Sequence, residues 1–379
     1  MEIPTKIPRF YADLEKYLEP NKVLVLYGPR RVGKTTLLND YLAKTKFKYK
    51  LDSGEDIRVQ EIMNSQSIAT LKDYAAGYEL IAIDEAQRIS HIGRALKMLV
   101  DHVPNLRVIA TGSSSFELAG QVGEPLTGRK TTLTLFPIAQ LELHGTNTPY
   151  DLKESLPDRL VFGSYPDILE TPTKDMKAKR LEELTHAYLF KDILELEQVK
   201  GSKVLLDLLR LLAFQVGSEV SLSELANQLS IDVKTVARYL DLFEKSFVVS
   251  NLRGFSRNLR KEVTQKSKYY FFDTGIRNAV VANFKGLEHR NDVGALWENF
   301  LVIERLKKRT YQDIFANQYF WRTWEQQEID LVEERGGKLF GYEFTWSGKS
   351  AKAPSAWVET YPEATFEIVS RENHLSFII

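Results

Sequence analysis

The chain has 379 residues, of which 43% are hydrophobic and 27% charged, and its 51 basic side chains equal its 51 acidic ones. This balance is typical of a folded globular protein, and a net charge of zero means that any surface for nucleic acid must be local. The absence of cysteine excludes disulfides, cysteine nucleophiles and cysteine-ligated zinc.

The length predicts two or three domains. No apolar run approaches the ~18 residues that a membrane span needs. We therefore expect a cytoplasmic protein without a membrane partner.

The first motif is a glycine-bracketed loop between an apolar run, residues 23–27, and a helical pattern, residues 35–43. Strand, Gly-x-x-x-x-Gly-Lys-Thr and helix in this order are typical of a phosphate-binding P-loop. Its backbone amides and the helix N-terminus attract a polyphosphate. The residues expected to bind nucleotide are Gly28, Pro29, Arg30, Arg31, Val32, Gly33, Lys34, Thr35 and Thr36.

Three side chains of this loop have separate expected roles. Lys34 should reach the β and γ phosphates, Thr35 should bind Mg²⁺ through its hydroxyl, and Thr36 is placed for the α phosphate. The expected cofactors are therefore ATP and Mg²⁺.

A second apolar run, residues 80–83, ends in Asp84 and Glu85. Four apolar residues followed by Asp-Glu, about 50 residues after a P-loop, form the Walker B pattern. We expect Asp84 to lie in the Mg²⁺ shell and Glu85 to activate the attacking water as a general base.

Two further residues are candidates for sensing the γ phosphate. Ser113 follows a third apolar strand, residues 107–111, although a serine there also suits a plain helix N-cap. Arg129 could stabilise the transferring phosphoryl group, in cis or from a neighbouring subunit, or could be a solvated surface arginine. A ring-shaped homo-oligomer with the arginine in trans stays open.

Repeated strand and helix patterns predict an α/β fold with a parallel sheet and helices on both of its faces. Nucleotide should bind at the carboxyl ends of the strands.

The middle of the chain predicts helices and then a winged helix-turn-helix. Residues 221–224 form a capping box, and two short helices follow around a tight turn at residues 230–232. The second helix and the hairpin after it carry side chains suited to a DNA groove and backbone. These candidates are Lys234, Thr235, Arg238, Tyr239, Arg253, Arg257, Arg260 and Lys261. A packing module without DNA contact is the alternative.

The last hundred residues predict a long helix followed by strands at 318–322, 327–332, 338–344 and 365–369. Glu298, Asp330 and Glu343 should approach one another there. This trio resembles the PD-(D/E)xK nuclease site, in which carboxylates hold Mg²⁺ and a lysine follows the second acid by two residues. Here that position is Thr345, so we expect a degenerate site.

Together these motifs resemble one family, the AAA-type P-loop ATPases of archaea and bacteria with a C-terminal domain long labelled as of unknown function. The stretches that carry the resemblance are residues 28–36, 80–87, 108–114, 125–129, 268–276, 294–300 and 328–330. The resemblance implies an AAA-like ATPase, a winged helix and a remnant of a restriction-endonuclease-like fold. The expected domains are 1–145 (ATPase), 146–202 (helical connector or lid), 203–275 (winged helix) and 276–379 (nuclease-like).

The leading interpretation is a Mg²⁺-dependent ATPase coupled to DNA binding or remodelling. Two alternatives remain: a nucleotide-gated regulator or scaffold without motor action, and an ATP-controlled nuclease.

Overall fold

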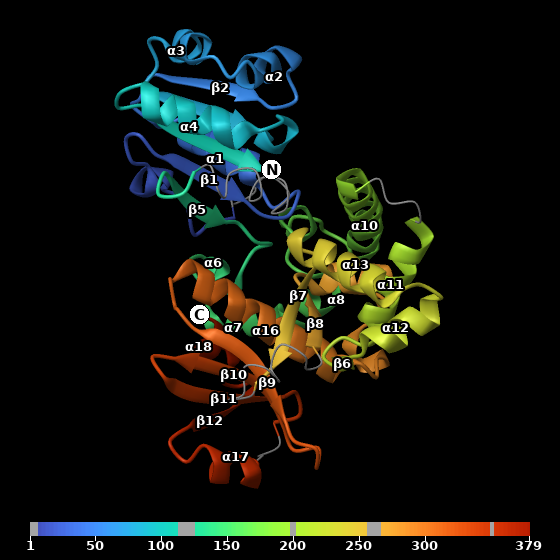
Figure 1. The fold of residues 1–379 in the computed structure, drawn as a ribbon. Coiled ribbons are helices and arrows are strands. Elements are labelled where there is room, and N and C mark those ends of the chain that lie inside the picture. The colour runs from blue at the N-terminus through green and yellow to red at the C-terminus, as the bar shows by residue number, and fades with distance from the viewer. Residues whose placement is uncertain (1–6, 113–125, 198–201, 256–266, 349–351) are drawn as a thin grey trace. The chain divides into compact units, whose positions relative to one another are not determined.

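The chain folds into two compact units in the computed structural model, which describes residues 7–112, 126–197, 202–255, 267–348 and 352–379. One unit contains Arg9–Pro137 with Lys245–Phe247, and the other contains Ile138–Glu244 with Val248–Ile379 (Figure 1). The four expected domains therefore fall into two units, and we describe each unit separately.

The first unit is an α/β fold with a five-stranded parallel sheet in the order β2-β3-β4-β1-β5. Helices flank this sheet, as Figure 1 shows. The strands are β1 (Val23–Tyr27), β2 (Tyr49–Ser53), β3 (Leu80–Asp84), β4 (Arg107–Gly112) and β5 (Lys130–Thr134). The helical elements are η1 (Leu14–Tyr17), α1 (Lys34–Leu42), α2 (Ile57–Asn64), α3 (Ile68–Ala75), η2 (Ala86–Arg88) and α4 (Ile92–His102).

The central strands of this sheet, β1, β3 and β4, are buried on both faces. On one face, Val25 of β1 and Ile83 of β3 share a core with Leu96 of α4. The alternate strand residues, such as Leu24 and Ile109, are also buried. Continuous apolar runs are what a parallel sheet covered on both sides requires, so the central strands were recognisable in the sequence.

The second unit is built on a mixed seven-stranded sheet in the order β12-β11-β10-β9-β7-β8-β6. Its strands are β6 (Glu219–Val220), β7 (Val249–Gly254), β8 (Ser267–Phe271), β9 (Asn317–Arg322), β10 (Glu328–Arg335), β11 (Lys338–Thr345) and β12 (Thr365–Ser370). The helices before β7 are α6 (Gln140–Leu143), α7 (Pro149–Glu154), α8 (Leu156–Phe162), α9 (Pro166–Leu169), α10 (Lys174–Glu197), α11 (Ser202–Phe214), α12 (Leu222–Leu229) and α13 (Val233–Lys245). Those after β8 are α15 (Thr274–Val280), η4 (Leu287–His289), α16 (Val293–Tyr311), α17 (Ser355–Thr360) and α18 (His374–Ile378).

The hairpin expected after the second helix is formed by β7 and β8, and both of its strands are part of this seven-stranded sheet. Strand β7 pairs with β8 on one side and, in parallel, with β9 on the other, where Arg253 is opposite Tyr319. The sheet thus runs across the boundary expected at residue 275. Sequence patterns show that a segment is a strand but not which edge of it finds a partner, so this continuity was not predicted.

A buried carboxylate fixes the start of α15. Asp273 accepts a hydrogen bond from the Ser164 amide at 2.7 Å and another from the Ile276 amide at 3.2 Å. It therefore caps α15 and also holds the chain between α8 and α9.

None of the helices in the described ranges is both long enough and apolar enough to cross a lipid bilayer.

We expect Asp273→Ala to lower the free energy of unfolding by about 2–4 kcal/mol, because two buried amides lose their acceptor. Urea unfolding followed by circular dichroism measures this change. Asp207→Ala is the control: it removes a half-buried carboxylate that pairs with the exposed Arg210 on the same helix, and should change the free energy by less than about 0.5 kcal/mol. Equal effects of the two substitutions would refute the role of Asp273.

Candidate functional site

The predicted nucleotide loop lies between the end of β1 and the start of α1. Gly33 is the N-cap of α1 and has a left-handed φ of 95°, which glycine adopts without strain. At Gly28 a Cβ would collide with the carbonyl oxygen of Leu135. Both glycines of the motif are therefore required by backbone geometry.

The Lys34 side chain turns back into this loop. Its ammonium donates hydrogen bonds to the carbonyl oxygens of Gly28 at 3.0 Å and Pro29 at 2.7 Å. Lys34 is buried, whereas Thr35 and Thr36 are exposed at the start of α1. The loop thus presents one ammonium and two hydroxyl groups at a helix N-terminus, as an anion site requires.

Asp84 lies beside Thr35 and is the centre of the site. The Thr35 hydroxyl donates to one carboxylate oxygen of Asp84 at 2.8 Å, and the Thr111 hydroxyl donates to the other. Asp84 is the last residue of β3, and Thr111 lies near the end of β4. The parallel sheet brings these strand ends to one edge, so residues far apart in sequence converge.

Glu85 follows Asp84 in a left-handed conformation with φ of 50°. Its amide donates to the Thr111 hydroxyl at 3.2 Å, and the Gln87 side-chain amide donates to its carboxylate at 2.5 Å. These bonds fix both the backbone and the carboxylate of Glu85 at the same sheet edge.

Two residues of this site were missed by sequence reasoning. Thr111 stands opposite Leu26 in the β1–β4 register. Its sequence signal was its position, because it is a polar residue near the end of a buried strand. Arg9 donates to the carbonyl oxygens of Val32 at 2.8 Å and Phe136 at 2.7 Å. Arg9 thereby links the loop to the chain that follows β5. No local sequence pattern predicts such a long-range contact.

The two sensor candidates differ in outcome. Ser113 lies outside the described residues, so its role stays a prediction. Arg129 immediately precedes β5 and pairs with Asp101 at 3.0 Å. It is thus at the amino edge of the parallel sheet, opposite the edge that carries the loop, and the structure does not support a cis role.

The residues expected to contact DNA are only partly exposed. Lys234 and Arg238 are exposed one helical turn apart on α13, Thr235 is half-buried, and Arg253 is exposed on β7. Tyr239 was expected to face outward but is only 4% exposed. The reason is helical spacing: it lies on the same apolar stripe as the buried Val236 and Phe243. Arg257, Arg260 and Lys261 lie outside the described residues.

The structure brings the three C-terminal carboxylates together. Asp330 on β10 and Glu343 on β11 occupy paired antiparallel strands, with Leu331 opposite Tyr342 beside them. Glu298 of α16 joins them, and its charge contributes, after burial, to raising the pKa of Asp330 well above its ordinary value. A buried lysine, Lys268 of β8, also enters this group and was not expected there.

Comparison with known families matches three stretches of the chain. Residues 20–144 match an AAA domain, residues 153–287 match a domain of unknown function (DUF8612), and residues 293–373 match a domain of unknown function (DUF4143). The AAA match covers the loop, Asp84 and Glu85.

Relatives align over most of the chain. It is 30% identical over 337 residues to the uncharacterized proteins Mb2031c of Mycobacterium bovis and Rv2008c of Mycobacterium tuberculosis, which covers 88% of this chain and 72% of each relative. It is 25% identical over 351 residues to the uncharacterized protein MJ1544 of Methanocaldococcus jannaschii, which covers 88% of this chain and 76% of that protein.

Among solved structures, the signal transduction ATPase (STAND) protein PH0952 of Pyrococcus horikoshii, which has a tetratricopeptide repeat sensor, matches 81% of this chain and 46% of that chain. The identity is 13% and the TM-score 0.31, a likeness too weak to carry an argument.

We expect Thr111→Val to destabilise the first unit by about 1–3 kcal/mol, because Asp84 loses a donor and the Glu85 amide loses its acceptor. Chemical denaturation with a probe in the first unit measures the loss. Thr132→Val, at an exposed position of β5, is the control and should be nearly neutral. If both variants are equally stable, Thr111 does not organise this edge.

Proposed function

The chain belongs to the same family as the mycobacterial proteins Mb2031c and Rv2008c and contains an AAA domain, and from this premise we propose that it binds ATP with Mg²⁺ and hydrolyses it to ADP and phosphate. The observation that carries the proposal is the convergence of Lys34, Thr35 and Asp84 at one sheet edge, with Glu85 next in the chain.

The oxygen atoms at this edge suit Mg²⁺. Thr35 and Asp84 are hard oxygen donors already within hydrogen-bond distance of each other, and such donors are the ligands that Mg²⁺ prefers. When bound, Mg²⁺ would neutralise charge on the phosphate oxygens.

The protein's own groups bind the phosphates, orient the terminal phosphoryl group and accept the proton of the attacking water. The loop amides and the Lys34 ammonium bind the β and γ phosphates, which orients the terminal phosphoryl group. Glu85 accepts the proton of the water that attacks phosphorus. The Gln87 amide and the Thr111 hydroxyl keep Glu85 in position for that transfer.

The central test is Glu85→Gln. The variant should bind ATP as tightly as the wild type, while turnover falls about 10²- to 10⁴-fold because the general base is lost. Phosphate release measures turnover, and a fluorescent ATP analogue measures binding. Glu55→Gln makes the same charge change at an exposed residue just after β2, and should leave both quantities unchanged.

Lys34→Ala tests the expected phosphate contact of the lysine in the same assays. Loss of a charge-assisted contact worth about 1.5–3 kcal/mol should weaken ATP binding roughly 10- to 150-fold. Unchanged affinity in Lys34→Ala, or unchanged turnover in Glu85→Gln, would contradict the proposed site.

We further propose that the second unit couples hydrolysis to duplex DNA through α13. What supports this is the pair of exposed cations one helical turn apart, Lys234 and Arg238, because exposed lysine and arginine on a helix suit phosphate contacts. A nucleotide-gated regulator or scaffold predicts instead turnover that is slow and indifferent to DNA. If a ring forms, Arg129 would have to act on the nucleotide of another copy.

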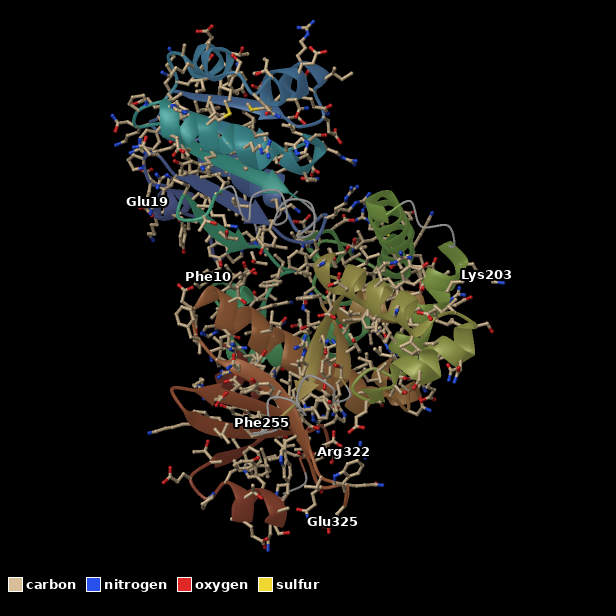
Figure 2. All side chains as sticks on the ribbon, in the orientation of Figure 1. Phe10, Glu19, Lys203, Phe255, Arg322 and Glu325 are labelled. Atoms are coloured by element: carbon tan, nitrogen blue, oxygen red, sulfur yellow. The ribbon has the colours of Figure 1, made fainter. Side chains whose placement is uncertain are left out.

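Fluorescence anisotropy with a labelled duplex across a salt series tests the DNA proposal. Replacing Lys234 and Arg238 with alanine should weaken binding and reduce the slope of log affinity against log salt by about 2. The matched control removes two positive charges from α11, at the exposed Lys203 (Figure 2) and Arg210. Salt-insensitive binding, or no binding, in the wild type would exclude α13 as a DNA contact.

A further inference from the structure

A buried lysine lies within the carboxylates of the C-terminal sheet. Lys268 is 2% exposed, and its ammonium lies 3.2 Å from a carboxylate oxygen of Glu298 and 2.5 Å from one of Glu328. Lys268 is on β8, and its ammonium lies 5.3 Å from the centre of the Phe320 ring on β9. We call Glu298, Glu328, Asp330 and Glu343, with Lys268, the carboxylate–lysine cluster.

Three of the four carboxylates of this cluster accept hydrogen bonds within the fold. The Glu298 oxygen that faces Lys268 also accepts from the Tyr270 hydroxyl at 2.6 Å. One oxygen of Asp330 accepts from the Phe344 amide at 2.8 Å. Arg322 of β9 (Figure 2) lies 3.8 Å from the second oxygen of Glu328. Glu298, Glu328 and Asp330 are thus bonded within the fold, whereas one buried oxygen of Glu343 has no hydrogen-bond partner.

This arrangement does not suit a divalent metal ion. A metal would need several carboxylate oxygens to converge on one open point, whereas here an ammonium lies between Glu298 and Glu328. In the described parts of the chain, no group of three or more His, Asp or Glu residues is arranged so that it could hold a metal. The residues thus do not fit the Mg²⁺ site of the nuclease that the sequence resembles.

We propose that the Lys268 ammonium is the resident cation of this cluster and supplies the positive charge that a divalent metal would otherwise provide. The C-terminal sheet is then complete without a metal, and its acidic residues serve as a structural ion cluster rather than as the centre of a nuclease. The nuclease motif has a lysine two residues after its second acid, where this chain has Thr345. Lys268 of β8 instead places its ammonium between Glu298 and Glu328.

The electrostatics of the cluster agree with this role. Burial by itself lowers the pKa of Lys268, but the charges of Glu298, Glu328 and Asp330 outweigh it, so that the pKa is raised and the ammonium stays charged. The four carboxylates, when ionised, carry more negative charge than the single positive charge of Lys268 can neutralise. Burial and the neighbouring charges of Glu328 and Glu298 raise the pKa of Glu343 to about 7, so protonation removes part of the excess negative charge.

The test compares Lys268→Met with wild type in nucleotide-free, full-length protein. Methionine keeps the stem but removes the charge, so the carboxylates lose their cation and the Tm should fall by roughly 5–15 °C. Adding Mn²⁺ should restore part of this loss and should bind to the variant, as measured by the electron paramagnetic resonance of free Mn²⁺. Lys338→Met removes an exposed lysine from β11 of the same sheet, and should match wild type.

A second comparison decides the matter even if Lys268→Met does not fold. Wild type and Asp330→Asn should bind Mn²⁺ equally, because the cluster holds no metal in either. Mn²⁺ bound by wild type and lost in Asp330→Asn, or Mg²⁺-dependent plasmid nicking abolished by that substitution, would overturn the proposal. So would a Lys268→Met variant with the wild-type Tm. None of these measurements depends on ATP hydrolysis, so the proposed function is tested separately.

Discussion

The Asp84 carboxylate is the interaction on which the first unit's site depends. It accepts hydrogen bonds from Thr35 at the start of α1 and from Thr111 of β4, and so joins the loop to two strands of the sheet. Thr111 in turn accepts from the Glu85 amide. One carboxylate therefore fixes the relative positions of the residues proposed to hold the metal and to activate water. An arrangement already formed before substrate binds loses little entropy when substrate arrives.

The second unit contains carboxylates in a different electrostatic situation. Near the nucleotide loop, Thr35 and Thr36 are exposed, so a charged ligand can replace the internal hydrogen bonds. In the carboxylate–lysine cluster, Lys268 is almost completely buried, and its ammonium pairs with Glu298 and Glu328. Breaking such a buried pair is costly, because the charge that remains has neither water nor a partner. The same residue types thus form an open site in one unit and a closed one in the other.

The continuous sheet limits how the second unit can contact other molecules. Because β7 is paired on both edges, this part of the hairpin cannot act as a free arm that enters a groove. Lys234 and Arg238 are exposed on α13, and they remain the residues that we propose to contact DNA. The buried Tyr239 is part of the core beneath that helix.

The sequence by itself determined the nucleotide loop, the Asp84-Glu85 pair and the parallel α/β fold around them. It could do so because a phosphate-binding turn and a strand-end acid pair place the required groups close together in the chain, at a spacing that chemistry constrains. Only the tertiary structure decided that Thr111 and Arg9 support the loop, that Arg129 lies at the opposite sheet edge, and that Lys268 lies among the acids of the C-terminal sheet. Those facts depend on strand order and on which strand edges pair, and both are set by packing between segments that are distant in sequence.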